Sequence, residues 1–364
     1  MSRAPRSRRA HEEEVAASAL DLDRLRVLLA DPDGALGYAL CQALRRLGAD
    51  VVCFGAERGE MAGVRWVAGH RSRPADLAGI GPGPFDAAID FGARGLDGPA
   101  AFAPAVRGRV GRMVQLGTWR VYGGAEDAPD CRGGGGPAGA DPGAGPWMPV
   151  PCPESAPKRD GAALDAEDGL WNRRAAGDYP ATVLRLAPLY GPGVRLAREW
   201  HAVGRLRAGC SRMALPDGGG QLLHRLYVDN AVHAIVRALD HPDEVDGRAF
   251  NVGDSRVATL AELCAGCAAA AGRRLELVPL PRSVHDTRSP WAVPRPVVLD
   301  LARLRHTLGY TEPVAPEEGL ARTVRYLLEL PEDDVLPTLA PYGSRWGCAH
   351  DHAGEQAALD AWRA

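Results

Sequence analysis

The chain has 364 residues, a formal net charge of −3 and 46% hydrophobic residues, which are ordinary values for a globular protein. This balance, without a run of basic and aromatic residues, argues against a nucleic-acid partner, and no apolar run reaches the about 18 residues of a membrane span. The N-terminus lacks the apolar core of a secretory signal, and the eight cysteines are scattered, so we expect reduced thiols and a cytoplasmic protein.

Strands and helices alternate over the first half of the chain. The predicted buried strands are residues 26–30, 51–54, 85–91, 112–116 and 181–186, and the predicted helices are residues 36–48 and 160–176. Such alternation is typical of βαβ units with parallel strands. We therefore predict an α/β protein with a Rossmann-type doubly wound parallel sheet and a smaller C-terminal α+β substrate portion.

The elements beyond residue 195 are shorter. We predict strands at 223–228 and 274–281, and helices at 229–240, 258–271 and 316–329. The predicted organisation is a mobile tail (1–23), a nucleotide-binding domain (24–194) with a long exposed loop (124–157), a substrate-binding portion interleaved with it (195–332), and a C-terminal extension (333–364) with a weakly helical end.

Two short cysteine patterns raise the question of a metal site. Cys264 and Cys267 form a C-x-x-C inside a stretch with helical apolar spacing, which favours small core-facing thiols over redox or metal use. Cys348, His350 and His352 form a C-x-H-x-H, but no fourth zinc ligand is evident. We predict no metal site.

The first strand runs into a glycine-bearing turn and then a helix. Gly34 and Gly37 permit a tight turn and close backbone approach, and the helix N-terminus attracts anions. Asp31 stands first in the turn. A negative charge about 4–5 Å from its carboxylate, such as a pyrophosphate, is repelled by about 3–4 kcal/mol unless the carboxylate points away or is paired. The residues predicted to meet a nucleotide here are Asp31, Gly34, Ala35, Leu36 and Gly37.

Seven segments carry a resemblance to a known family. They are ADPDGALG (30–37), FDAAIDF (85–91), MVQLGTWRVYG (113–123), ATVLRLAPLYGPG (181–193), HRLYVDNAVHAIVRAL (224–239), RAFNVGD (248–254) and RLRHTLGYTEPVAPEEGLARTV (303–324). Their order resembles the extended and atypical short-chain dehydrogenase/reductase superfamily, in its NAD-dependent epimerase/dehydratase branch, over about residues 26–330. The resemblance implies NAD or NADP as cofactor and a small-molecule substrate, and it allows a homodimer.

The catalysts of that superfamily are a tyrosine and a lysine spaced i, i+4 on one helix. The only lysine here is Lys158, and the residue four before it is Glu154, so no Tyr-x-x-x-Lys exists. Alignment back from Glu167 puts the expected tyrosine on Arg159 and the expected lysine on Ala163. A guanidinium does not give up its proton, so the ordinary Tyr/Lys chemistry is excluded.

Residues that would select the nucleotide also depart from the family pattern. The acidic residue that would hold the ribose hydroxyls after the second strand is replaced by Gly55 or Ala56. Arg58 would accommodate a 2′-phosphate, whereas Glu57 beside it argues the other way. His70 occupies the acidic position near the adenine. NAD and NADP both remain open.

The resemblance also implies which side chains face the cleft. The catalytic candidates are Thr118, Tyr122 and His224, the further cofactor contacts are Arg58, His70, Gly117, Arg185 and Pro188, and the substrate contacts are Trp119, Arg120, Tyr190 and Arg225. Several have structural alternatives, such as packing for Tyr122 and loop orientation for Arg185 and Tyr190. The arginines would suit an anionic substrate.

Two functions remain open at this point. One is a divergent NAD(P)-dependent epimerase/dehydratase-like or reductase-like protein that acts on a small polar, anionic or sugar-type substrate without Tyr/Lys catalysis. The alternative is a cofactor-free enzyme or a pseudoenzyme scaffold, in which the Rossmann fold has survived and the ligand has been lost.

Overall fold

The computed structural model describes residues 25–56, 63–92, 102–122, 148–158, 162–281, 296–340, 343 and 352–363. Its main sheet has seven strands in the order β11-β6-β5-β4-β1-β2-β3, and every neighbouring pair is parallel. The strands are β1 (Arg26–Ala30), β2 (Asp50–Gly55), β3 (Arg65–Ala68), β4 (Ala87–Asp90), β5 (Met113–Thr118), β6 (Ala181–Leu186) and β11 (Ala249–Val252). The predicted Rossmann-type sheet is confirmed.

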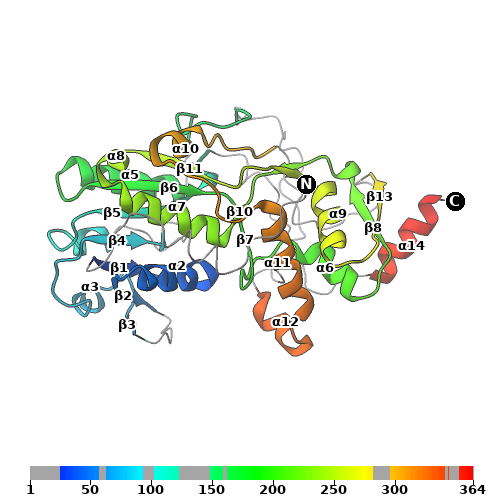
Figure 1. The fold of residues 1–364 in the computed structure, drawn as a ribbon, viewed down its shortest axis with the longest axis horizontal. Helices are drawn as coiled ribbons and strands as arrows, with labels where there is room; N and C mark the ends of the chain where they lie inside the picture. The colour runs from blue at the N-terminus through cyan, green and yellow to red at the C-terminus, as the bar shows by residue number, and fades with distance from the viewer. Residues whose placement is uncertain are drawn as a thin grey trace, which may run out of the picture.

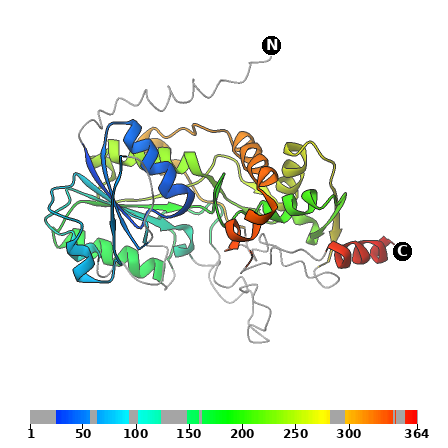
Figure 2. The same cartoon turned by 90° about the horizontal axis from the view of Figure 1, so that it is seen from below.

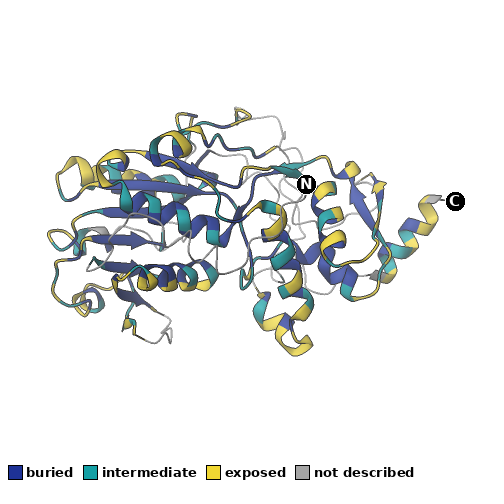
Figure 3. Cartoon of the chain, in the orientation of Figure 1, coloured by how far each residue is buried: buried dark blue, intermediate teal, exposed yellow. Residues whose placement is uncertain are grey.

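Helices cover both faces of this sheet, as Figure 2 shows. One face carries α2 (Gly34–Arg46) and α7 (Val228–Asp240), which contact each other, and the other face carries α3 (Pro74–Ala78), α4 (Phe102–Ala105) and α5 (Ala162–Ala175). Apart from the edge strand β3, the strands are almost fully buried between these layers (Figure 3). Their apolar runs are continuous because both faces of a doubly wound sheet are covered.

The strand order reverses between β1 and β4. β2 and β3 extend from β1 in one direction, while β5, β6 and β11 extend from β4 in the other. In doubly wound sheets, ligands bind beyond the carboxyl ends of the strands at such a reversal point. The carboxyl ends here face the smaller portion of the molecule (Figure 1).

The smaller portion packs three helices beside a two-stranded sheet. These are α6 (Trp200–Arg207), α9 (Leu260–Ala270) and α11 (Pro316–Glu329), with β8 (Arg212–Pro216) paired to β13 (Glu276–Leu280). At the far end, α14 (His352–Arg363) contacts β8 (Figure 1). α7 and β11 lie between residues 195 and 332 in sequence but belong to the main sheet and its layers.

The remaining elements are short. They are η2 (Trp119–Tyr122), β7 (Leu189–Tyr190), η3 (Asp217–Gly219), β9 (Leu222–Leu223), β10 (Leu226–Tyr227), α8 (Pro242–Val245), β12 (Ala258–Thr259), α10 (Ala302–Leu308) and α12 (Glu332–Thr338). The predicted strand at 223–228 is therefore wrong as a single element. β9 pairs with β12 and β10 pairs with β7, so the segment changes partner between them.

Several predicted bounds are confirmed, and others are not. The strands at 26–30 and 181–186 and the helix at 316–329 have the predicted limits. β3 was not predicted, because an edge strand with exposed ends has no apolar run. The tail at 1–23 and residues 124–147 of the predicted loop lie outside the described residues. Among the described residues, no helix is long and apolar enough to cross a membrane.

Candidate functional site

The turn between β1 and α2 has the backbone shape that a phosphate needs. A Cβ on Gly37 would lie 2.2 Å from the carbonyl oxygen of Pro32, so only glycine lets the helix begin this close to the turn. Gly34 has a φ of +62°, and a Cβ there would meet nothing within 4 Å. The N-cap residue Asp33 makes no side-chain hydrogen bond to the helix. The first N–H groups of α2 are therefore suited to a diphosphate, and this part of the site fits the predicted nucleotide.

Asp31 is paired, which answers the predicted repulsion. Arg71 donates from Nη1 to Oδ2 of Asp31 at 2.9 Å and from Nη2 to Oδ2 of Asp90, also at 2.9 Å. The backbone N–H of Gly92 donates to the other oxygen of Asp90. Burial raises the pKa of Asp31 above its ordinary value, and the neighbouring Arg71 opposes that rise. A phosphate at this turn would meet a carboxylate that is paired with Arg71, in place of a lone carboxylate.

The guanidinium of Arg71 lies across the reversal point of the sheet. It connects Asp31, just after β1, with Asp90, at the end of β4. Arg71 is only 6% exposed and lies 5.3 Å from the ring centroid of Phe102. A Cβ on Gly92 would lie 1.2 Å from Nη1 of Arg71, so the guanidinium rests directly on the backbone after β4. The position of Arg71 beside Asp31 is not evident from the sequence, because Arg71 follows β3 and is 40 positions from Asp31.

The other predicted nucleotide contacts differ in their burial and their partners. His70 is half-buried, with Nδ1 at 2.7 Å from Oγ of Ser72 and its backbone N–H donating to Asp76. At Gly117, a Cβ would lie 2.9 Å from Val183, so the β5–β6 packing requires glycine there. Pro188 is half-buried. Arg58 lies outside the described residues.

Arg185 and Tyr122 belong to a buried network behind the end of β5. Arg185 donates twice to Glu167 on α5, at 2.9 and 2.8 Å, and donates from Nη1 to the Tyr122 hydroxyl at 2.7 Å. The Tyr122 hydroxyl in turn donates to Oδ1 of Asn251 at 2.5 Å. Burial raises the pKa of Tyr122 well above its ordinary value. The phenol joins η2, β6 and β11, and its predicted catalytic role stays a prediction.

The lysine ammonium and this phenol are at opposite ends of the network. Nζ of Lys158 lies 3.6 Å from the carboxylate of Glu167, which is fully buried. Glu167 and Arg185 lie between Lys158 and Tyr122 in the chain of contacts. The ammonium therefore acts on a carboxylate, whereas in the family pattern it would act on the phenol.

His224, predicted as a catalytic candidate, contacts backbone groups through both ring nitrogens. Its Nε2 donates to the carbonyl oxygen of Asp254 at 2.6 Å, and its Nδ1 accepts from the backbone N–H of Leu299 at 3.0 Å. The ring is 2% exposed, and burial lowers its pKa. Both nitrogens are engaged, Nε2 as a donor and Nδ1 as an acceptor.

Two of the predicted substrate contacts are buried in a second network. The Tyr190 hydroxyl donates to Asp254 at 2.7 Å, and the Arg225 guanidinium, 4.2 Å from the Tyr190 ring centroid, donates to Glu199 at 2.7 Å. Each of these groups is partnered within the protein. They hold the segments after β6 and before α7 in place.

Thr118, Trp119 and Arg120 lie together at the carboxyl end of β5. Thr118 and Arg120 are half-buried, and the backbone N–H of Arg120 is 3.4 Å from Oγ1 of Thr118. Trp119 is 4% exposed and packs into the core. Of the three predicted catalytic residues, Thr118 is the one whose side chain remains partly accessible.

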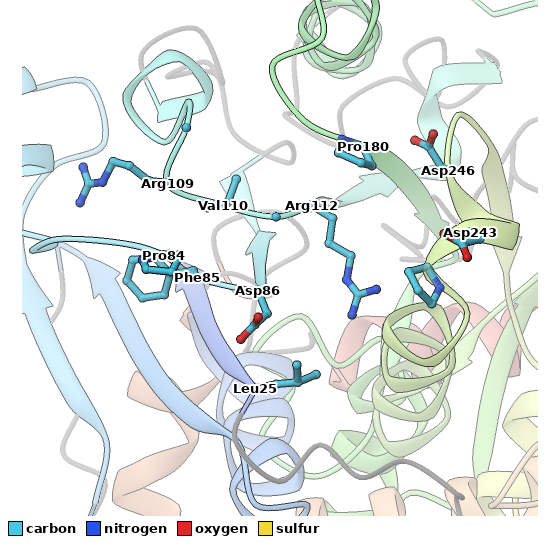
Figure 4. A pocket seen from close by; sticks show the side chains of 13 residues that line it. Leu25, Pro84, Phe85, Asp86, Arg109, Val110, Arg112, Pro180, Asp243 and Asp246 are labelled. Carbon is cyan, nitrogen blue, oxygen red and sulfur yellow. The ribbon is translucent and has the colours of Figure 1, made fainter.

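A pocket of about 720 Å³ opens at the amino ends of the strands of the main sheet, opposite the carboxyl ends that carry the nucleotide turn. Its walls include Leu25, Phe85 and Pro180, which adjoin the amino ends of β1, β4 and β6 (Figure 4). Arg112 points between Asp86 and Asp243, and burial lowers its pKa. This pocket lies across the sheet from Asp31 and Thr118, so it is separate from the nucleotide turn.

Comparisons with known proteins agree with this architecture. The model of the NAD dependent epimerase/dehydratase family matches residues 163–253. The 3-diazoavenalumate denitrifying reductase of a Streptomyces species is 31% identical over 229 residues, which cover 59% of this chain and 72% of that relative.

Solved structures show the same fold at low identity. Epimerase Mth375 from Methanothermobacter thermautotrophicus has a TM-score of 0.66 and 17% identity, with 88% of this chain and 96% of that chain covered. UDP-glucuronic acid 4-epimerase from Bacillus cereus, in complex with NAD, has a TM-score of 0.63 and 15% identity, with 84% and 99% covered. The sequence relative and the family model together show that this chain belongs to the NAD-dependent epimerase/dehydratase family.

Proposed function

We propose that this chain is an NAD(P)H-dependent reductase that acts on a small carboxylate without a Tyr/Lys proton relay. The observation that carries the proposal is the pairing of a phosphate-shaped turn at Gly34 and Gly37 with the loss of the catalytic pair. The space beside Gly34 is open, since a Cβ there would meet nothing within 4 Å, and this leaves room for a ligand at the start of α2. The Streptomyces relative, 72% of which is covered by this chain, is named a reductase.

The chemistry of that relative's named substrate explains how a reductase can work without a phenol. Reduction of a ketone leaves charge on an oxygen, which a tyrosine must protonate. In reductive loss of nitrogen from a diazo-bearing ring carbon, hydride forms a new C–H bond, and the C–N bond breaks with its electron pair departing as N₂. Dinitrogen leaves as a neutral molecule and takes no proton. We therefore propose a diazo-bearing aromatic carboxylate as the substrate class.

The residues that follow β1 and β5 have the following roles in this proposal. The first N–H groups of α2, at Gly34, Ala35 and Leu36, would bind the diphosphate. Bound NAD(P)H would supply the hydride. Thr118 would orient the substrate through its hydroxyl, and Arg120 would attract its carboxylate. The buried networks around Arg185 and Arg225 keep the flanking segments rigid.

The test uses the purified chain with NADH or NADPH and a diazotised aminohydroxycinnamate labelled with ¹⁵N. The expected result is stoichiometric oxidation of the nicotinamide with release of labelled N₂, and Thr118→Val should slow it. Binding of the nucleotide is measured separately by calorimetry. A chain that binds neither nucleotide would refute the reductase proposal, whereas binding without turnover would refute the diazo substrate alone.

A cofactor-free protein is the second candidate, and one observation favours it. The ion pairs of Arg71 with Asp31 and Asp90 lie at the reversal point, where the adenosine half of a nucleotide would lie. If these side chains block that half, the double variant Asp31→Gly with Arg71→Leu should bind nucleotide where the wild type does not.

A further inference from the structure

We propose that Asp31 is the acid that receives the adenosine ribose hydroxyls in this chain, in place of the acid missing after β2, and that it makes the site selective for NAD(H) over NADP(H). The inference rests on the proposed nucleotide binding and specifies which nucleotide is bound. In dinucleotide-binding folds this carboxylate comes from the residue after the second strand. Here it would come from the turn after the first strand.

The first step is the position of the Asp31 carboxylate. Gly55 is the last residue of β2, where a ribose-binding acid would stand, and it has no side chain. A Cβ built on Gly55 would lie 3.2 Å from Oδ1 of Asp31. The carboxylate of Asp31 therefore occupies the space into which a side chain at position 55 would extend. The exchange places the same functional group at nearly the same point from a neighbouring strand.

The second step is the orientation of the carboxylate. Asp31 has a φ of +54°, which turns its side chain away from the ordinary direction after a strand. Its backbone N–H donates to the carbonyl of Phe54, which ties the turn to β2. Arg71 takes only Oδ2, while the Asp31 side chain keeps 28% of its surface exposed. Oδ1 is thus the oxygen at the end of β2, and a carboxylate oxygen accepts readily from a hydroxyl.

The third step is the support behind Asp31. Arg71 is 6% exposed and is held by Asp90, itself 3% exposed, and by the ring of Phe102. Arg71 therefore acts as a fixed clamp and is not an open cation available to a 2′-phosphate. Two carboxylates and one guanidinium leave one net negative charge, which would repel that phosphate and accept ribose hydroxyls.

The test measures dissociation constants of NADH and NADPH by calorimetry on four proteins. They are the wild type, Asp31→Asn, the double variant Asp31→Gly with Gly55→Asp, and Asp33→Asn. The wild type should bind NADH at least about tenfold more tightly than NADPH, a difference of about 1.4 kcal/mol. Asp31→Asn should reduce that ratio toward one, and the double variant should restore it by returning the acid to β2. Asp33→Asn removes the same charge from the same turn and should leave the ratio unchanged.

The outcomes separate this inference from the function beneath it. Binding with a ratio near one in the wild type, or a ratio that Asp31→Asn does not alter, overturns the inference and leaves the reductase proposal standing. Tighter binding of both nucleotides by Asp31→Asn shows that Asp31 obstructs the site, and also overturns it. No binding by any of the four proteins removes the nucleotide proposal itself. Thermal melting of each variant confirms that the proteins compared are folded.

Discussion

At the scale of single residues, one guanidinium is the counter-charge of two carboxylates. Arg71 is 7% exposed in its side chain, while Asp90 is 4% exposed and Asp31 is 28% exposed. A buried charge that loses its partner costs far more than the pair contributes, because the remaining charge cannot be hydrated. The pairs therefore matter for stability as well as for the site.

Arg71→Met should lower the free energy of unfolding by about 3–5 kcal/mol, since Asp90 would remain buried without its counter-charge. Urea denaturation measures the change. The matched control is Arg174→Met, which removes a half-exposed pair with Asp246 and should lower the free energy of unfolding much less. Equal effects of the two substitutions would contradict the view that burial sets the cost.

The raised pKa of Asp31 should make the selectivity for NADH over NADPH depend on pH. Burial raises this pKa, Asp90 and Asp33 add to the rise, and Arg71 opposes it. The carboxylate repels a 2′-phosphate only when ionised, so selectivity for NADH should be full above the raised pKa and should fall as the pH drops through it. The loss should begin at a higher pH than for an ordinary aspartate, whose pKa is about 3.9.

The measurement for this dependence is the ratio of NADPH to NADH dissociation constants in a series of buffers from neutral to acidic pH. The 2′-phosphate of NADPH also titrates in this range, so the same series on Asp31→Asn supplies the correction. A wild-type curve that parallels the Asp31→Asn curve would show that Asp31 does not set the selectivity.

At the scale of elements, η2 follows β5 and contacts β6 and β11 through Tyr122. Its hydroxyl accepts from Arg185 on β6 and donates to Asn251 on β11. Removing a buried hydroxyl leaves both partners unsatisfied, at a cost of about 1–3 kcal/mol. Thr118, one residue before η2, is only half-buried. The two hydroxyls should therefore respond differently to removal.

Tyr122→Phe should lower stability by about 1–3 kcal/mol and leave kcat within a few-fold of wild type at a temperature where the variant is folded. Thr118→Val should do the reverse, with a small change in stability and a larger loss of kcat/KM. Thermal melting and turnover are measured on both. A large loss of kcat in a folded Tyr122→Phe would restore the catalytic role predicted for this residue.

The predicted elements and the predicted site differ in how far local sequence determines them. Strands such as 26–30 are evident because a doubly wound sheet makes them continuously apolar. The glycine turn is evident because its conformation requires specific residues within one segment. The roles of Asp31 and His224 are not evident, since Arg71 and Leu299, which decide them, are 40 and 75 positions away in sequence. Cleft-facing side chains were predicted by resemblance, but Tyr122, Arg185, Tyr190 and Arg225 lie in buried networks here.

At the scale of the whole molecule, the nucleotide turn and the C-terminal helix belong to different portions of the chain. The nucleotide turn and the Arg71 pairs belong to the main sheet, whereas α14 packs on the far end of the smaller portion (Figure 1). Leu359 of α14 is fully buried in a cluster with Ala214, Val278 and Leu280. The C-terminal helix is therefore part of the smaller portion's core.

A buried ion pair fastens this helix. Glu355 accepts from Arg205 on α6 at 2.8 Å and from the backbone N–H of Ala214 on β8 at 3.0 Å, and it is 1% exposed. Glu355→Met should therefore lower the free energy of unfolding by about 3–5 kcal/mol, because Arg205 would stay buried and unpaired. Asp360→Ala is the control, since its pair with Arg212 is largely exposed on the acid's side and should be worth less than about 1 kcal/mol.

Nucleotide affinity supplies the second measurement on the Glu355→Met variant. Because α14 contacts the smaller portion and the nucleotide turn belongs to the main sheet, dissociation constants for NADH should match the wild type under conditions where the variant is folded. Loss of stability together with loss of affinity would mean that the two portions act as one cooperative unit. Loss of stability alone would mean that the C-terminal extension serves the smaller portion, and that the nucleotide site depends on the doubly wound sheet.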